Sequence, residues 1–104
     1  TSLQHSTVVS SRHKSGKKLY EIADVTIDNC GEKGDAVFEI EGLNTPTGPT
    51  SDTTGTAIGQ AIVATALDIL VKMGITPPVF VSSNVDGGDE HNDRLFDKYY
   101  GFTK

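Results

Sequence analysis

The most regular hydrophobic pattern in this chain runs from about Thr54 to Met73. Apolar residues recur there at spacings of three and four, which is the period of an α-helix. A helix that is apolar around most of its circumference is buried on two sides. The pattern therefore predicts a long core helix over about 54–73 that ends at Gly74. One apolar row comprises Ile58, Ile62, Ile69 and Met73, and the second comprises Val63, Leu67, Leu70 and Val71.

The start of this helix and its surroundings can be read from residue types as well. Asp52, Thr53 or Thr54 can cap its first turn, because each side-chain oxygen accepts a backbone N–H bond. Polar residues within the helix argue against a membrane span, so we expect no membrane partner. These residues are Gln60, Thr65 and Asp68.

The rest of the chain shows shorter patterns separated by Gly- and Pro-containing loops. We expect a helix over about 10–22, a strand at Val25–Asp28, an edge strand at Ala36–Glu41, a loop over 43–52, a short apolar segment at Val79–Val81 and a final helix over 90–99.

These elements are too few to close a hydrophobic core. A strand with the composition of Val25–Asp28 is typical of a parallel sheet covered by helices on both faces. We therefore interpret the chain as part of an α/β domain that lacks its first half. The missing half would come from another polypeptide or from a cleaved segment. The first residue, Thr1, is not a methionine, and it is interpreted as a cut in mid-sequence.

Charge and cysteine content narrow the function classes. The chain has 104 residues and a formal net charge of −5, which argues against nucleic acid and acidic membranes as partners. Cys30 is the single cysteine, so the chain has neither a disulfide framework nor a zinc constellation, and we expect a cytoplasmic protein without metal or cofactor. A basic cluster can be a solvated helix face or can attract a phosphorylated ligand. It comprises Arg12, Lys14, Lys17 and Lys18.

The richest set of reactive side chains lies near the C-terminus, over residues 82–92, around a Gly87-Gly88 turn. Glycines let a ligand approach the backbone, and the neighbouring carboxylates, imidazole and amides could bind sugar hydroxyls. The alternative is a solvated turn in which Asp86 or Asp89 caps the last helix. His5 and His13 have weaker claims than His91. Glu39 and Glu41 share one side of a strand, which suits either an exposed edge or a ligand-facing pair.

Several motifs together resemble the sugar isomerase (SIS) domain family. The run Leu19-Tyr20-Glu21-Ile22-Ala23-Asp24 looks like the family's helix that enters a late strand, and Glu39–Gly42 through Thr50–Thr54 looks like its loop before the long final helix. More narrowly, the Ser-Arg-His, Asp-Asn-Cys-Gly, Glu-Ile-Glu-Gly and Asn-Val-Asp-Gly-Gly-Asp-Glu-His-Asn runs are similar to an uncharacterised bacterial group of single-SIS proteins. The resemblance covers nearly the whole chain.

The resemblance implies a three-layer flavodoxin-like parallel sheet, of which residues 1–104 form the C-terminal half. Residues 1–81 would hold the strand and helix core and residues 82–104 the C-terminal loop and helix. It also implies dimers or higher homo-oligomers that pack through the long helix, where Gly55 and Gly59 allow close approach. Thr1 and Ser2 would lie near the ligand crevice.

Phosphosugar binding is the function that the resemblance implies, either in a sugar-phosphate isomerase that opens the ring and transfers a proton or in a non-catalytic sensor module. His91 is the expected catalytic residue, with Glu90 holding its tautomer. Related phosphoheptose isomerases carry a histidine where this chain has Asp68, and the family's glutamate base would lie in the missing half. The expected substrate-binding residues are Thr50, Ser51, Thr53, Thr54, Gln60, Asp89 and Asn92.

Overall fold

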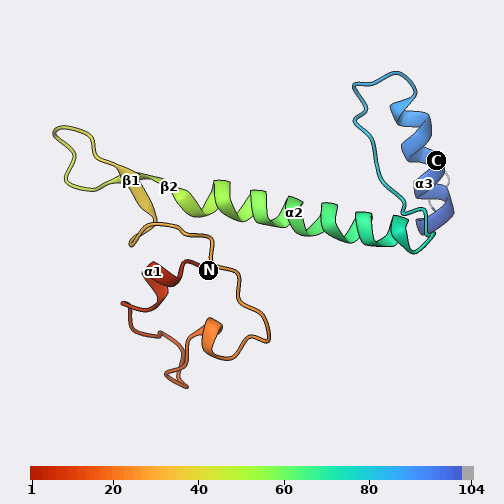
Figure 1. Cartoon of the computed structure of the whole chain (residues 1–104). Helices are drawn as coiled ribbons and strands as arrows, with labels where there is room; N and C mark the ends of the chain where they lie inside the picture. Colours follow the sequence, from red (N-terminus) through yellow and green to blue (C-terminus); the bar gives the residue numbers. More distant parts are fainter. Residues whose placement is uncertain (102–104) are drawn as a thin grey trace. The chain divides into compact units, whose positions relative to one another are not determined.

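The computed structural model describes residues 1–101 of the chain (Figure 1). Within them the chain forms two compact units, residues 1–64 and the described residues from 65 onward, and the longest helix in sequence includes the boundary. The domain division expected at residue 81 stays a prediction. The elements in chain order are α1 (Leu3–Ser6), the 3-10 helix η1 (Leu19–Glu21), β1 (Ala36–Phe38), β2 (Thr47–Pro49), α2 (Thr50–Lys72) and α3 (Gly88–Tyr100).

The sheet differs from the expected one. β1 and β2 form a two-stranded antiparallel sheet, with Ala36 opposite Pro49 and Phe38 opposite Thr47. The three-layer, flavodoxin-like parallel sheet is therefore wrong for the described residues. The two strands are joined by the short loop 39–46, and such a connection produces an antiparallel hairpin, whereas parallel strands need a long crossover.

The predicted strand Val25–Asp28 is not part of this sheet. Its only ladder-like bonds among the described residues involve Thr1, whose nitrogen donates to the Ile27 carbonyl at 3.1 Å and whose carbonyl accepts from Asn29 N at 2.8 Å. Val25 is 78% exposed and Ile27 is 44% exposed, so the described part of the chain leaves the apolar side chains of this segment largely uncovered.

The predicted helix over 10–22 is also wrong, except for the single turn of η1. Gly16 has a φ of +70°, which interrupts a right-handed helix. Serine hydroxyls bond to the local backbone instead: Ser11 Oγ donates to the Lys17 carbonyl and Ser15 Oγ accepts from Lys17 N. Such side-chain bonds compete with the helical ladder.

Helix α2 begins four residues earlier than expected and ends as predicted. At its end Gly74 N donates to the Val71 carbonyl and Ile75 N to the Leu70 carbonyl, with Gly74 at a φ of +77°. This pair of bonds is the Schellman motif, which favours glycine at the left-handed position. The expectation that the helix ends at Gly74 is therefore confirmed.

Helix α2 has an unusual surface for a core helix, since none of its residues is buried. It is long and apolar enough to cross a membrane by length and composition, with a mean hydropathy of 1.5 over 18 residues. Long core helices of soluble proteins have the same length and composition. By hydropathy alone α2 could be a membrane span, although its polar residues argue against one.

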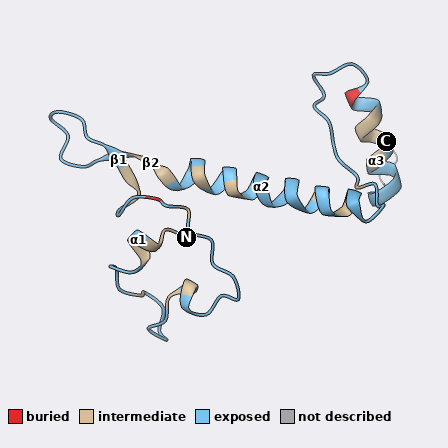
Figure 2. Ribbon diagram, in the orientation of Figure 1, coloured by how far each residue is buried: buried red, intermediate tan, exposed pale blue. Residues whose placement is uncertain are grey.

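The described residues enclose no hydrophobic core. Only Gly31 and Gly88 are buried, and they are the two red segments in Figure 2. The chain exposes 8529 Å², whereas a folded monomer of this mass exposes roughly 5,700 Å². The exposed apolar side chains come from nearly every segment and include Leu19, Phe38, Ile62, Val71 and Met73.

The second unit is organised by hydrogen bonds between α3 and the extended segment before it. The Asn92 side chain accepts from Val81 N at 3.0 Å and donates to the Val81 carbonyl at 2.8 Å. Phe80 packs on Phe96 with ring centroids 4.8 Å apart. Gly87 is the N-cap of α3 and provides no side chain, so the capping expected from Asp86 or Asp89 is wrong.

We expect the 104-residue chain by itself to lack a cooperative folding transition, because it has no buried apolar cluster to stabilise it. Urea titration followed by circular dichroism should give a shallow, non-sigmoidal change, while the full-length protein should unfold in one sharp step. A sharp transition of the isolated chain as a dilute monomer would contradict this expectation.

Replacing Gly88 by alanine should destabilise the second unit by about 1–3 kcal/mol, because overpacking displaces backbone. A Cβ at this position would lie 2.3 Å from the Ser82 carbonyl oxygen. The control is Ser83→Ala, which changes an exposed side chain in the segment before α3. Urea midpoints of the full-length variants measure the difference. Equal midpoints for the two variants would show that Gly88 is not required.

Candidate functional site

The first unit contains a polar pocket of about 300 Å³. Its walls come from α1 and the two residues before it, from the loop 29–35 and from the first turn of α2. Four hydroxyls, one imidazole, one amide and two carboxylates face this space. The lining residues are Thr1, Ser2, His5, Ser6, Asn29, Glu32, Asp35 and Ser51.

The wall formed by α1 is held by Asp28 and Ser2. The Asp28 carboxylate accepts from Leu3 N and from Cys30 N, both at 3.0 Å, and these backbone bonds hold the pKa of Asp28 below its ordinary value. Ser2 is the N-cap of α1, where its hydroxyl accepts from His5 N and donates to the Gly31 carbonyl. Two segments far apart in sequence are thereby joined at the pocket.

The wall formed by α2 depends on Asp35. Its carboxylate accepts from Ser51 Oγ at 2.7 Å, from Ser51 N at 2.8 Å and from Thr50 Oγ1 at 2.9 Å. These bonds, first that of the Ser51 hydroxyl, lower the pKa of Asp35. The Asp35 side chain therefore caps the first turn of α2, a role that the residue types predicted for Asp52, Thr53 or Thr54.

Gly31 is buried next to the pocket, where it lies close to Ser2 and Thr50. A Cβ at this position would lie 3.0 Å from Thr50 Oγ1 and 3.2 Å from Asn29 Oδ1. Asn29 Oδ1 also accepts from Gly31 N at 3.0 Å, which keeps the amide of this asparagine in a fixed orientation. The absence of a side chain at Gly31 thus allows the loop to approach α2 closely.

The remaining polar side chains are fixed by neighbours. His5 is half-buried, and its Nδ1 accepts from Gly34 N at 3.0 Å. Glu32 accepts from Gln4 Nε2 at 3.3 Å, and the hydroxyls of Thr1 and Ser6 lie 2.8 Å apart. These contacts orient the groups that a ligand would meet.

The side chain of Lys18 brings a positive charge next to the pocket. Lys18 Nζ donates to the carbonyl oxygen of Ser6 at 2.5 Å, and the residue is half-buried, whereas its neighbour Lys17 is exposed. An ammonium group has three donors, so this bond leaves two for other acceptors. Of the expected basic cluster, Lys18 is the member that the structure brings to this site.

The expected substrate residues at the start of α2 are placed differently from one another. Ser51 lines the pocket, and Thr50 is half-buried against Asp35. Thr54 Oγ1 donates to the Thr50 carbonyl at 2.8 Å, and Thr53 is exposed. The hydroxyls of Thr50 and Ser51 therefore already bind a carboxylate, which stands where a phosphate was expected.

Gln60 and Asp68, the two expected polar residues further along α2, do not line this pocket. Gln60 is exposed in the first unit. Asp68 belongs to the second unit and forms an exposed ion pair with Lys72 at 2.6 Å. Such a pair between residues four apart is a common way to satisfy a charge on a helix surface.

The C-terminal candidates form their own group in the second unit. His91 Nε2 lies 2.9 Å from the Val79 carbonyl and Asn92 binds Val81, so both side chains hold the extended segment against α3. Asp89 and Glu90 are exposed in the first turn of α3. The catalytic role of His91 and Glu90 and the binding role of Asp89 and Asn92 stay predictions.

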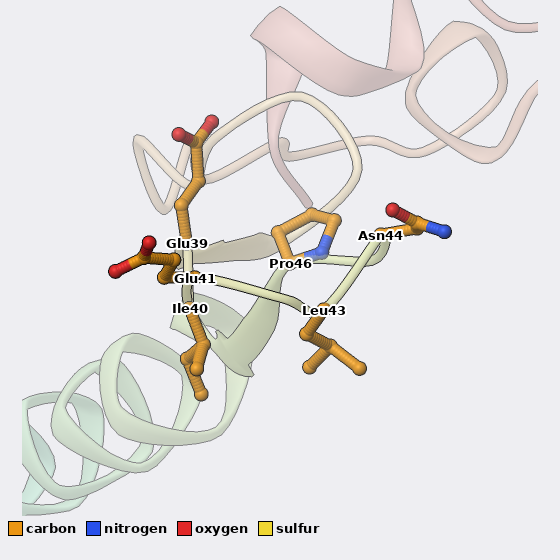
Figure 3. Close-up of a pocket in the computed structure, with 6 residues that line it drawn as sticks. All are labelled: Glu39, Ile40, Glu41, Leu43, Asn44 and Pro46. Atoms are coloured by element: carbon orange, nitrogen blue, oxygen red, sulfur yellow. The ribbon is translucent and has the colours of Figure 1, made fainter.

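A second hollow of about 280 Å³ lies in the loop between β1 and β2 (Figure 3). Ile40 and Leu43 point to the same side of the loop, whereas the carboxylates of Glu39 and Glu41 point in different directions. The lining residues include two carboxylates and no cation, so this loop suits an anionic ligand poorly.

Sequence reasoning missed most of the polar pocket. The sequence gives His5 a weaker claim than His91, and it predicts no ligand contact for Asn29, Glu32 or Asp35. Thr1 and Ser2 line the pocket. Their expected place near the ligand crevice of an open parallel sheet stays a prediction. The missed signal was the dense run of hydroxyls around His5. Among the described residues no group of three or more His, Cys, Asp or Glu side chains could hold a metal ion.

Comparison with known proteins gives relatives without an assigned activity. A UPF0309 protein of Halalkalibacterium halodurans is 52% identical over 99 residues, which cover 95% of this chain and 41% of that protein. UPF0309 proteins of Geobacillus thermodenitrificans and Listeria innocua are 46% and 48% identical, and the match covers 40% of each. No family model matches the chain. The chain spans about two-fifths of the length of these curated relatives.

The Asp35 contacts predict a specific pH dependence of stability. Because the folded-state pKa of Asp35 lies below its ordinary value of 3.8, its contribution to stability is present above that value and is lost as the pH falls through the folded pKa. Asp35→Asn should therefore lower the urea midpoint of the full-length protein at about pH 7 and flatten its decline toward about pH 3.

The matched control for this experiment is Asp24→Asn, which removes an exposed carboxylate outside the pocket. It should leave both the midpoint and its pH profile nearly unchanged. An unaltered acid profile in Asp35→Asn would contradict the stabilising role of the Asp35 carboxylate.

Proposed function

We propose that this chain is part of a sugar-phosphate-binding protein and that the pocket between α1, the loop 29–35 and α2 is its binding site. The observation that carries the proposal is the gathering of hydroxyl, amide and imidazole groups from distant parts of the sequence around one space. Such groups bind the hydroxyls of a sugar, because each can donate or accept a hydrogen bond.

The phosphate would lie at the edge of the pocket next to Lys18. Two carboxylates, Glu32 and Asp35, line the interior and would repel a dianion there. Lys18 at the Ser6 carbonyl supplies the positive charge and retains two donors for phosphate oxygens. We therefore place the phosphate next to Lys18 and not at the N-terminus of α2, because the Asp35 carboxylate already binds there.

The similarity of the sequence motifs to the SIS family supports this choice of ligand. The proposed reaction is aldose–ketose isomerisation, in which a ring is opened and a proton moves between adjacent carbons. The alternative is a sensor module that binds the same ligand without turnover. Transfer of deuterium from solvent to the carbon next to the carbonyl would favour the enzyme, and binding without exchange would favour the sensor.

We also propose that the functional protein is larger than this chain and acts in the cytoplasm as a homo-oligomer. The exposed apolar side chains of α2, including Ile62, Val63 and Ile69, need cover in the folded protein. The remainder of the polypeptide and a second copy of it would provide that cover. This chain matches only about two-fifths of the relatives' length, which supports a larger functional protein.

Lys18→Met tests the proposed site in the full-length protein. We expect ribulose 5-phosphate to bind roughly fivefold to tenfold more weakly, because the variant loses a charge-assisted hydrogen bond that is partly screened by solvent. Isothermal titration calorimetry measures the change, and Lys17→Met is the control because that neighbour is fully exposed. Equal effects of the two substitutions would contradict a phosphate at Lys18.

A further inference from the structure

The most informative contact in the pocket is the hydrogen bond from Gly34 N to His5 Nδ1, with a length of 3.0 Å. A backbone N–H can only donate, so Nδ1 must offer its lone pair and carry no proton. The proton of the neutral imidazole is therefore on Nε2. His5 thus offers a ligand a hydrogen-bond donor, since its acceptor nitrogen is already engaged.

The turn that provides this bond is shaped for close contact with α1. Gly34 has a φ of +85° and Asp35 a φ of +73°, and Asp35 N donates to the Glu32 carbonyl at 2.9 Å. A left-handed conformation is uncommon for a residue other than glycine. The bonds of Asp35 to Thr50 and Ser51 hold the turn in place. The same turn therefore fixes the His5 tautomer and the start of α2.

We propose that His5 binds the carbonyl oxygen of an open-chain sugar phosphate through its Nε2–H. A neutral imidazole held in this tautomer can polarise a carbonyl and can stabilise the negative charge that develops on its oxygen. This role rests on the proposed function, and it assigns to His5 the contact that distinguishes a sugar with a carbonyl from the corresponding polyol.

The tautomer can be measured without any ligand. In the full-length protein with ¹⁵N-labelled histidine, His5 should show a protonated Nε2 and an unprotonated Nδ1 at neutral pH. His13 is an internal comparison that should show the same tautomer, because its Nδ1 also accepts from a backbone N–H, that of Ser15 at 3.3 Å. A proton on Nδ1 of His5 would overturn the proposal.

The ligand contact is tested with His5→Asn and a pair of probes. The asparagine Oδ1 can still accept from Gly34 N, but the shorter side chain removes the Nε2–H. We expect ribulose 5-phosphate to bind roughly threefold to tenfold more weakly, which is the effect of one lost hydrogen bond. Ribitol 5-phosphate, which has no carbonyl, should bind within about twofold of the unaltered protein.

The outcomes separate this proposal from the proposed function. His13→Asn should change neither affinity. If His5→Asn weakens both probes equally or neither, the carbonyl role is overturned while sugar-phosphate binding stands. If the unaltered protein binds neither probe, both proposals are overturned. Unchanged circular dichroism and urea midpoint of His5→Asn show that the result does not arise from unfolding.

Discussion

The carboxylate of Asp35 is the contact on which the organised part of the first unit depends. It accepts three hydrogen bonds from the first two residues of α2, while its own backbone carbonyl accepts from Thr50 N at 2.9 Å. These bonds join a turned loop to a helix whose first N–H groups have no partners within the helix. The loop then supplies Gly34 to His5 and brings Glu32 to the pocket. The cap that Asp35 provides therefore positions the turn that contacts His5 and carries Glu32.

The second constraint is the large apolar surface that the described residues leave uncovered. Burial of apolar area is the main favourable term in folding, yet Val25, Leu19 and Met73 are 78%, 75% and 67% exposed. Hydrogen bonds between loops contribute only about 0.5–1.5 kcal/mol each, so they do not replace a core. The polar pocket is thus a local arrangement within a surface that the described residues leave largely apolar and uncovered. The proposed activity belongs to a protein larger than this chain.

The second unit shows how side chains with catalytic potential can serve structure instead. Asn92 binds both backbone groups of Val81, as a neighbouring strand would, and His91 contacts the Val79 carbonyl. Phe80 on Phe96 adds the apolar contact. The same packing requires glycine at position 88, because a Cβ there would collide with the Ser82 carbonyl. The run that attracted a functional interpretation therefore has a clear structural role in this unit.

Local periodicity by itself determined the long helix and its end, because apolar spacing and a left-handed glycine at Gly74 are properties of neighbouring residues. It also determined the final helix, which the structure places at Gly88–Tyr100. It failed for residues 10–22, where serine hydroxyls bind the local backbone, and for Val25–Asp28, which has no sheet to join among the described residues. Only tertiary structure could place Asp35 at the start of α2 or Gly34 at His5. Those contacts join residues 15 to 29 positions apart, and no local pattern encodes such pairings.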